Sequence, residues 1–494
     1  MLGPSLRSGY SRYAAINVSS SAQQKAGKSA PTRSVVAALA AGFLLRALFV
    51  VFWPHIEGDS FLYGDLATNL LHHHIYGLTD ADSIRPTLIR LPGYPLFLAA
   101  IFGVTGGHWT AVLWLQALAD LAGCWCMARL AEAVAGERAG SVTLWAAALC
   151  PFTANYTSAG MTETLVVVTT AMAFYAMARV LECWQRRVAS TRWLLVTGAS
   201  LAASVLLRPD QALLVVAVVV PLAWIAIRGP LRIARLFETA AVGALVLLPL
   251  SFWAARNWRV FHVVQPLAPR YATDPGERVN YGFQRWYRTW GAEFASTDAV
   301  YWGYDGSPIL WDALPARVCD TPVECAHTAR VLDAYNRTGS ASAQSDAAFA
   351  RLAAERIRAH PVRYYVEMPL LRLADMALRP RVENLPLPVR WWRFQEHPTE
   401  TVFCAAYGLL NALYLLAALA GCWRWRRAGW RPWPTLAAAM LGFVLLRCAL
   451  LLTLDNSEPR YTLECFPVFL VICGMAAAGR GLKRPVAGAA RPVA

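Results

Sequence analysis

The chain has 494 residues, of which 57% are apolar, and its mean hydropathy is +0.37. Soluble globular proteins have an apolar share of roughly 45–50%, so this composition excludes an ordinary soluble domain and makes the lipid bilayer the solvent of the chain. The formal net charge of +15 would suit nucleic acid, but Lys and Arg of membrane proteins collect in cytoplasmic loops. We therefore expect membrane lipids, and no nucleic acid, as partners.

The chain begins with a polar segment, residues 1–34, that is rich in Ser, Ala and Gly and has no apolar core. We predict a disordered cytoplasmic tail there, and the apolar run that follows is too long for a signal peptide. A transmembrane helix needs about 20 mainly apolar residues. By this measure the sequence predicts an α-helical polytopic membrane protein with about ten spans, near 35–53, 109–131, 138–154, 164–181, 193–207, 209–227, 236–254, 401–423, 433–453 and 461–479.

Basic residues set the expected orientation of these spans. With the tail inside, the basic loops all fall on the cytoplasmic side, as the positive-inside rule requires; they carry Arg138, Arg186, Arg187, Arg192, Arg228, Arg232, Arg235, Arg424, Arg426, Arg427 and Arg431. The stretch 93–105 is short and contains two prolines, so we expect a re-entrant or interfacial helix there. Both termini, including the tail 480–494, are then cytoplasmic. Compact loops rich in Arg and Ala suggest a bacterial inner membrane.

Two long polar segments then lie on the outer face. The first, 54–108, belongs to an N-terminal membrane module of residues 35–254. The second, 255–400, is long and aromatic enough for a folded extracytoplasmic domain of mixed secondary structure. The last spans follow within 401–479.

The outer domain carries two further features. Its last part, 360–378, interleaves Tyr, Leu and Met with Arg and predicts an amphipathic helix lying in the membrane interface. Cys319 and Cys325 are close enough in sequence for a disulfide, which an oxidising outer compartment permits.

Acidic residues gather at the outer ends of the first and fourth spans. Glu57 and Asp59 follow the first span, Asp65 comes one turn or more later as a supporting acid, and Glu163 opens the fourth span. Such carboxylates can act as a general base or hold a divalent cation. A solvated loop explains Glu57 and Asp59 as well, and a helix start favours a carboxylate such as Glu163 by its dipole alone.

Arginines stand at the same outer ends. Arg90, Arg208 and Arg460 could grip a phosphate bidentately, or simply extend from the membrane interface toward water. Deeper in the first two spans, Arg46 and Asp120 are expected to pair because charge is costly in the bilayer. We favour a structural role for that pair over a catalytic one.

Metal-ligating patterns are weak. The cysteines show no CxxC pair and no Cys/His metal spacing. The run His72, His73 and His74 cannot converge on one ion if it is helical, because successive side chains point about 100° apart. We therefore expect no histidine or cysteine metal centre.

The order of these motifs resembles a family, the polyprenyl-phosphate-dependent GT-C glycosyltransferases, which include protein O-mannosyltransferases and bacterial lipid A aminoarabinose transferases (families 39 and 83). The resemblance rests on five short motifs on one face. These are "EGDS" with Asp59, "RLPGYP" with Arg90, "TET" with Glu163, "LLRPD" with Arg208 and "EPRY" with Arg460.

The resemblance implies a function. The donor would be a sugar on a polyprenyl phosphate, transferred with inversion to a lipid, glycan or protein acceptor at the outer face. Asp59 would be the base, and Glu163 would support the acceptor or a metal, which leaves a divalent cation at this pair open. Arg208, Arg460 and Arg90 would stabilise the departing lipid phosphate.

Two alternatives stay open at this point. A lipid or sugar transporter or flippase is also polytopic with buried charge, but the sequence shows neither an internal repeat nor paired broken helices. An enzyme similar to O-antigen ligases would also handle lipid-linked sugars, although such enzymes rely on basic residues and His in a late outer loop. Here the carboxylates after the first and third spans carry the signal.

Overall fold

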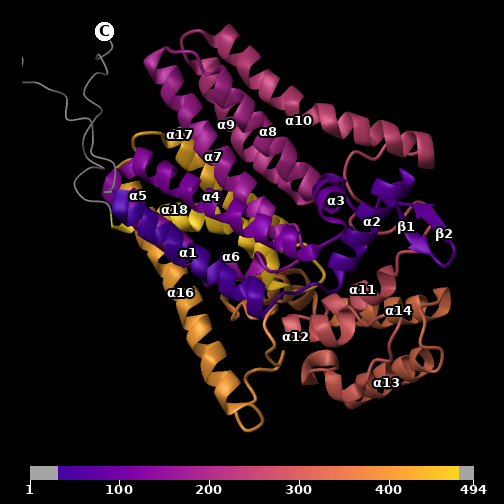
Figure 1. Cartoon of the computed structure of the whole chain (residues 1–494). Helices are drawn as coiled ribbons and strands as arrows, with labels where there is room; N and C mark the ends of the chain where they lie inside the picture. The colour runs from indigo at the N-terminus through magenta and orange to yellow at the C-terminus, as the bar shows by residue number, and fades with distance from the viewer. Residues whose placement is uncertain (1–31, 478–494) are drawn as a thin grey trace, which may run out of the picture.

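The computed structural model describes residues 32–477, so the two predicted tails lie outside it apart from the first residues of helix α1. The described chain is mainly helical, as the sequence predicts (Figure 1). Its α-helices are α1 (Thr32–Phe52), α2 (Asp59–His73), α3 (Gly93–Thr105), α4 (Trp109–Ala135), α5 (Glu137–Ala148), α6 (Pro151–Tyr156), α7 (Glu163–Arg186), α8 (Thr191–Leu207), α9 (Ala212–Arg228), α10 (Arg232–Phe261), α11 (Tyr281–Arg288), α12 (Phe294–Ser296), α13 (Pro322–Asn336), α14 (Ala343–Ala359), α15 (Met368–Leu378), α16 (Pro398–Arg427), α17 (Pro434–Leu451) and α18 (Phe466–Ala476). Short 3₁₀ or π segments are η1 (Pro209–Gln211), η2 (Thr297–Tyr301), η3 (Trp311–Ala313), η4 (Ala316–Val318), η5 (Arg363–Glu367) and η6 (Pro459–Cys465).

Seven helices of this described part are long and apolar enough to cross a membrane: α1, α4, α7, η1 with α9, α10, α16 and α17. The chain is therefore a multi-pass membrane protein. Each of the other three predicted spans contains a shorter helix, because α5, α8 and α18 have 12, 17 and 11 residues. The predicted span 138–154 is divided because Pro151 lacks a backbone N–H and begins a new helix. By length and apolar composition seven helices of the described chain qualify as spans, so the predicted count of about ten is not confirmed.

The membrane bundle is held together by helix packing and by a buried ion pair between α1 and α4. Helix α18 packs against α16 and α5, and α4 packs against α5 and α7. Arg46 of α1 donates from Nε to Oδ2 of Asp120 in α4 over 2.9 Å, and neither side chain is exposed by more than 1%. The carbonyl oxygens of Gly42 and Ala148 accept further hydrogen bonds from Arg46. This pair joins the first two predicted spans, as the sequence indicates.

The first outer segment folds as helix α2 followed by a two-stranded antiparallel sheet. Strands β1 (Gly77–Asp80) and β2 (Ser83–Pro86) pair with Gly77 opposite Pro86. Asp65 fixes this hairpin to α2, because its carboxylate accepts hydrogen bonds from the backbone N–H and the hydroxyl of Thr79, each at 2.7 Å. The stretch 93–105 forms helix α3, which packs against α2.

The second outer segment is helical where a mixed domain was expected. Between residues 255 and 400 the structure has helices α11 to α15 and no strand. Helix α14 has an Ala-rich sequence with high helix propensity and begins with a capping box formed by Ser342 and Ser345. The aromatic core of this domain includes Trp286, Tyr335 and Phe349. Helices α11 to α14 lie together at the end of the bundle that also carries α2 and the sheet (Figure 1).

Two sequence features fall within this domain. Cys319 and Cys325 are joined by a disulfide immediately before and within the first turn of α13. The stretch 360–378 forms the π segment η5 and then α15, in place of one regular helix. Tyr365 and Leu370 leave apolar surface exposed there, at 66% and 53%, so an interfacial position for this segment stays a prediction.

Candidate functional site

Three motifs that are far apart in sequence meet at Asp59. Asp59 begins helix α2 after the left-handed Gly58, and Arg90 lies in the loop before α3. Arg90 Nη2 lies 2.9 Å from Asp59 Oδ1, while Arg460 Nη2 of segment η6 lies 3.2 Å from Oδ2. The two oxygens of one carboxylate are thus each bound by a different arginine. The structure brings together the residues that the sequence singled out.

Glu163 joins the same cluster at the start of helix α7. Its Oε1 lies 2.8 Å from Arg208 Nη1 and 3.8 Å from Arg460 Nε, and its side chain is only 2% exposed. Arg460 therefore stands between Asp59 and Glu163 and contacts both. Its Nε also contacts Glu458, which is buried.

A second group of charged residues lies deeper in the bundle, next to Arg208. The sequence did not predict that these residues form a cluster. Arg208 Nε is 2.9 Å from Glu464 Oε1 and its Nη2 is 3.3 Å from Asp210 Oδ2. Arg447 of α17 contacts the same two carboxylates, Glu464 at 2.9 Å and Asp210 at 2.5 Å. Gln211 also donates to Glu464. Four guanidiniums and five carboxylates thus form one continuous ion-pair network, whose formal charge is −1.

The network runs from a partly accessible edge to a sealed interior. The side chains of Asp59 and Arg90 are 28% and 24% exposed, whereas those of Arg447 and Glu464 are 1% exposed. Solvent therefore reaches the Asp59 end of the network but not its inner end. We name the residues Asp59, Arg90, Glu163, Arg208 and Arg460 the outer cluster.

Electrostatics keep Asp59 ionised. Burial by itself raises the pKa of Asp59, but Arg460 and Arg90 outweigh this effect and hold the pKa at about 2. The reason is that two guanidiniums within hydrogen-bonding distance favour the charged carboxylate far more than water does. The same pairing makes the carboxylate a weak base as long as both arginines stay bound to it.

The geometry does not suit a divalent cation between Asp59 and Glu163. The guanidinium of Arg460 contacts both carboxylates, and Arg90 holds the remaining oxygen of Asp59. A hard cation needs several oxygen ligands at 2.0–2.6 Å. Within residues 32–477, no group of three or more His, Cys, Asp or Glu side chains is placed to hold a metal.

Two of the predicted supporting acids lie apart from the outer cluster. Glu57 is exposed before α2. Asp65 is occupied by Thr79 and serves the hairpin. The histidines 72–74 are exposed at the end of α2.

The sequence does contain a signal for the three acidic residues that were not predicted, Glu464, Glu458 and Asp210. Glu464 lies inside the predicted span 461–479, where an acidic residue is costly and marks a buried partner or a functional site. Glu458 stands two residues before Arg460 in the same short outer loop. Asp210 directly follows the "RP" of the fourth motif, "LLRPD". Each could have been predicted as an arginine partner, although not which arginine it would meet.

Comparison with known proteins supports the resemblance inferred from the motifs. A family model described as dolichyl-phosphate-mannose-protein mannosyltransferase matches residues 86–253. This match spans Arg90, Glu163 and Arg208, so the resemblance to GT-C glycosyltransferases is confirmed for that part of the chain. Comparison with curated protein sequences finds no significant match.

Similar solved structures are distant. ArnT from Cupriavidus metallidurans bound to undecaprenyl phosphate has 15% identity and a TM-score of 0.38, covering 92% of this chain and 78% of that one. The archaeal oligosaccharyltransferase AglB from Archaeoglobus fulgidus, in complex with an inhibitory peptide and a dolichol-phosphate, has 11% identity and a TM-score of 0.45. This match covers 90% of the present chain and 50% of AglB.

Proposed function

We propose that this chain is a membrane glycosyltransferase of the GT-C type that moves a sugar from a polyprenyl-phosphate donor to an acceptor at the outer face of the membrane. The single observation that carries the proposal is the outer cluster, in which three arginines from three loops meet the carboxylates of Asp59 and Glu163. The family match over residues 86–253 supports a mannosyltransferase-like donor chemistry. A bacterial inner membrane remains part of the proposal.

Asp59 is the proposed general base. It takes the proton of an acceptor hydroxyl or amine as that atom attacks the anomeric carbon of the donor sugar. The bond between the anomeric carbon and the phosphate oxygen breaks, and the electron pair leaves with the polyprenyl phosphate. Attack opposite to the leaving group inverts the anomeric centre.

The arginines supply the leaving-group stabilisation. Arg90, Arg208 and Arg460 are all within contact of a carboxylate, so their N–H groups are already oriented. Preorganised donors of this kind stabilise developing phosphate charge without reorganising during the reaction. Glu163, which is buried against Arg208 and Arg460, holds two of these side chains in place.

Donor binding would also activate the base. Because each arginine of the outer cluster is already paired, a donor phosphate that enters the cluster competes with the carboxylates for their N–H groups. Asp59 is the most exposed of these carboxylates. When the phosphate draws Arg460 or Arg90 away, the pKa of Asp59 rises and its carboxylate becomes a stronger base.

The test is sugar transfer from a radiolabelled polyprenyl-phosphate sugar by the purified chain in detergent with lipid extract. Asp59→Asn should lower transfer by roughly 10²–10⁴-fold, as loss of a general base does. The same variant should bind polyprenyl phosphate at least as tightly as the wild type, because its arginines are released. Asp80→Asn, at an exposed carboxylate on β1, is the matched control.

Two outcomes would contradict the proposal. One is undiminished donor consumption by Asp59→Asn. The other is a wild-type chain that consumes no donor across several sugars but moves lipid equally well with Asp or Asn at position 59, which would favour a transporter.

A further inference from the structure

A second cluster of arginines lies in the outer domain, and its charge is not neutralised. Arg372 of α15 is fully buried. Its Nη1 donates to the carbonyl oxygens of Gly291 at 2.9 Å and Arg288 at 3.3 Å. Within residues 32–477, its Nε and Nη2 have no hydrogen-bond partner and no carboxylate forms an ion pair with it. An unpaired buried charge costs several kcal/mol, so this guanidinium requires an explanation.

Two further arginines of this domain, Arg288 and Arg270, lie beside Asp455. Arg288 Nε lies 3.5 Å from Asp455 Oδ1, and Arg270 Nη2 lies 3.8 Å from the same atom. Neither distance is a hydrogen bond, and the Nε of Arg288 is also without a partner. Asp455 is 4% exposed, while Arg288 and Arg270 are 24% and 48% exposed on the outer side.

The charges here do not balance. Arg288 and Arg270 share one carboxylate and Arg372 has none, which leaves a formal excess of two positive charges. Burial and then the neighbouring Arg288 lower the pKa of Arg372 to about 10, and the attraction of Asp455 does not offset them. Asp375, one turn from Arg372, is occupied by the backbone N–H of Phe294 and the hydroxyl of Ser457.

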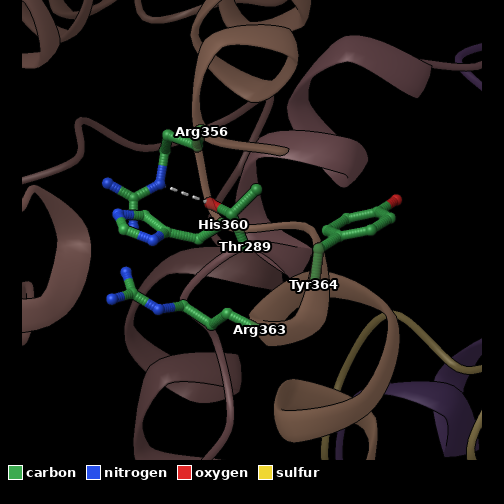
Figure 2. Close-up of a pocket in the computed structure, with 5 residues that line it drawn as sticks. All are labelled: Thr289, Arg356, His360, Arg363 and Tyr364. Carbon is green, nitrogen blue, oxygen red and sulfur yellow. Dashed lines mark hydrogen bonds between the residues drawn. The ribbon is translucent and has the colours of Figure 1, made fainter. Parts of the chain in front are cut away.

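The same domain shows how a buried arginine is satisfied when it is purely structural. Arg356, which is 4% exposed, donates to Thr289 Oγ1 at 2.8 Å (Figure 2). It also donates to two backbone carbonyls and to Glu324. Arg363 beside it pairs with Asp320. Native structures satisfy nearly all buried polar groups in this way, and among the arginines of this domain only Arg372 and Arg288 have a buried N–H group without a hydrogen-bond partner in the described chain.

We propose that Arg372, Arg288 and Arg270 form a binding site for an anionic phosphate group, and that Asp455 occupies this site in the ligand-free chain. Guanidiniums bind phosphate oxygens through paired N–H groups, and the free N–H groups of Arg372 and Arg288 supply them. Asp455 lies in the short loop between α17 and η6, and Arg460 is the second residue of η6. The identity of the ligand rests on the proposed function: the phosphate is that of the acceptor, bound beside the loop that leads to Arg460.

The experiment measures phosphate binding by the change in melting temperature and does not depend on sugar transfer. The full-length chain in detergent is melted in sodium phosphate and in sodium chloride of equal ionic strength. A second arm compares mixed micelles of phosphatidic acid with micelles of phosphatidylcholine. All measurements are repeated in Arg460→Gln, so that phosphate binding at the donor arginines does not mask this site.

Two variants are expected to change the phosphate affinity in opposite directions. Arg288→Gln should weaken phosphate binding by about tenfold or more, because it removes a charge-assisted hydrogen bond. Asp455→Asn should strengthen it, because the internal anion that competes for the site is gone. Arg285→Gln, which removes an exposed charge from the same helix α11, should leave it unchanged.

Stabilisation by phosphate alone would support a soluble phosphorylated ligand, and stabilisation by phosphatidic acid as well would support a lipid head group. No stabilisation in either arm, equal phosphate affinity in Arg288→Gln, or weaker binding in Asp455→Asn would overturn the site. If phosphate binds as expected but no sugar donor is ever consumed, the anion site stands and only its link to an acceptor falls with the proposed function.

Discussion

Arg90 offers a direct test of how the outer cluster controls its base. Two arginines hold the pKa of Asp59 at about 2, below its ordinary value of 3.8, so the carboxylate stays ionised until the solution is strongly acidic. We expect wild-type kcat/KM for the donor to show no acid limb from Asp59 down to about pH 4. Arg90→Gln removes one of the two favourable charges. Its acid limb should therefore move to higher pH, into the measurable range.

The control for this profile is Arg85→Gln, which removes an arginine that is 64% exposed on the nearby strand β2. Its pH profile should match the wild type. An unshifted acid limb in Arg90→Gln would show that Asp59 is not the titrating base. The sign also holds for stability: the ion pairs of Asp59 stabilise the fold above its ordinary pKa and are lost as the pH falls through the lowered value.

Individual charged residues were predictable where the bilayer makes charge expensive. Arg46 and Asp120 each require a partner of opposite charge in the bilayer, and they form an ion pair with each other. The outer ends of spans likewise drew attention to Asp59, Glu163 and Arg460. Their partners were not predictable, because Arg460 meets Asp59 across 401 positions of sequence and only the folded bundle sets that distance.

At the scale of elements, helices α16 and α18 approach each other closely at a glycine. A Cβ atom built on Gly421 of α16 would lie 1.9 Å from the carbonyl oxygen of Ile472 in α18. Small residues allow membrane helices to approach closely and gain van der Waals contact. Gly421→Ala should therefore separate the two helices and lower stability by about 1–3 kcal/mol or more, seen as a lower melting temperature in detergent.

Gly442 of α17 is the matched control for this substitution. Nothing lies within 4 Å of a Cβ atom built on it, and Ala has the higher helix propensity. Gly442→Ala should keep or raise the melting temperature. Equal melting of both variants would show that the close approach of α16 and α18 contributes nothing to stability.

Elements were predictable where one physical rule dominates. Each of the ten apolar stretches contains a helix, because a chain in lipid must satisfy its own backbone hydrogen bonds. Helix lengths were less predictable, since Pro151 and the short α18 depend on local chain breaks and packing. The β1–β2 hairpin was missed because its strands have four residues each, and the outer domain proved helical because burial of aromatic side chains does not require strands.

At the scale of the whole molecule, the outer cluster and the helical domain act as one unit. The loop between α17 and η6 connects them: Ser457 of this loop is hydrogen-bonded to Thr297 and Asp375 of the domain, while Arg460, at the start of η6, contacts Asp59. A ligand that moves this loop would therefore change contacts at both ends. This link gives the domain a physical route to the proposed base.

The proposed function also requires these parts to share the side of the membrane opposite to the basic loops. Val188 lies between the arginines of the α7–α8 loop and is 55% exposed, and Leu310 of the outer domain is 64% exposed. A single cysteine at each position, in a background without the three partly buried free cysteines, gives a test by membrane-impermeant maleimide on intact cells. We expect labelling of Leu310→Cys at once and of Val188→Cys only after permeabilisation, because Lys and Arg loops are retained in the cytoplasm. The reverse pattern would place Asp59 on the cytoplasmic side, where the proposed donor head group would have to be cytoplasmic as well.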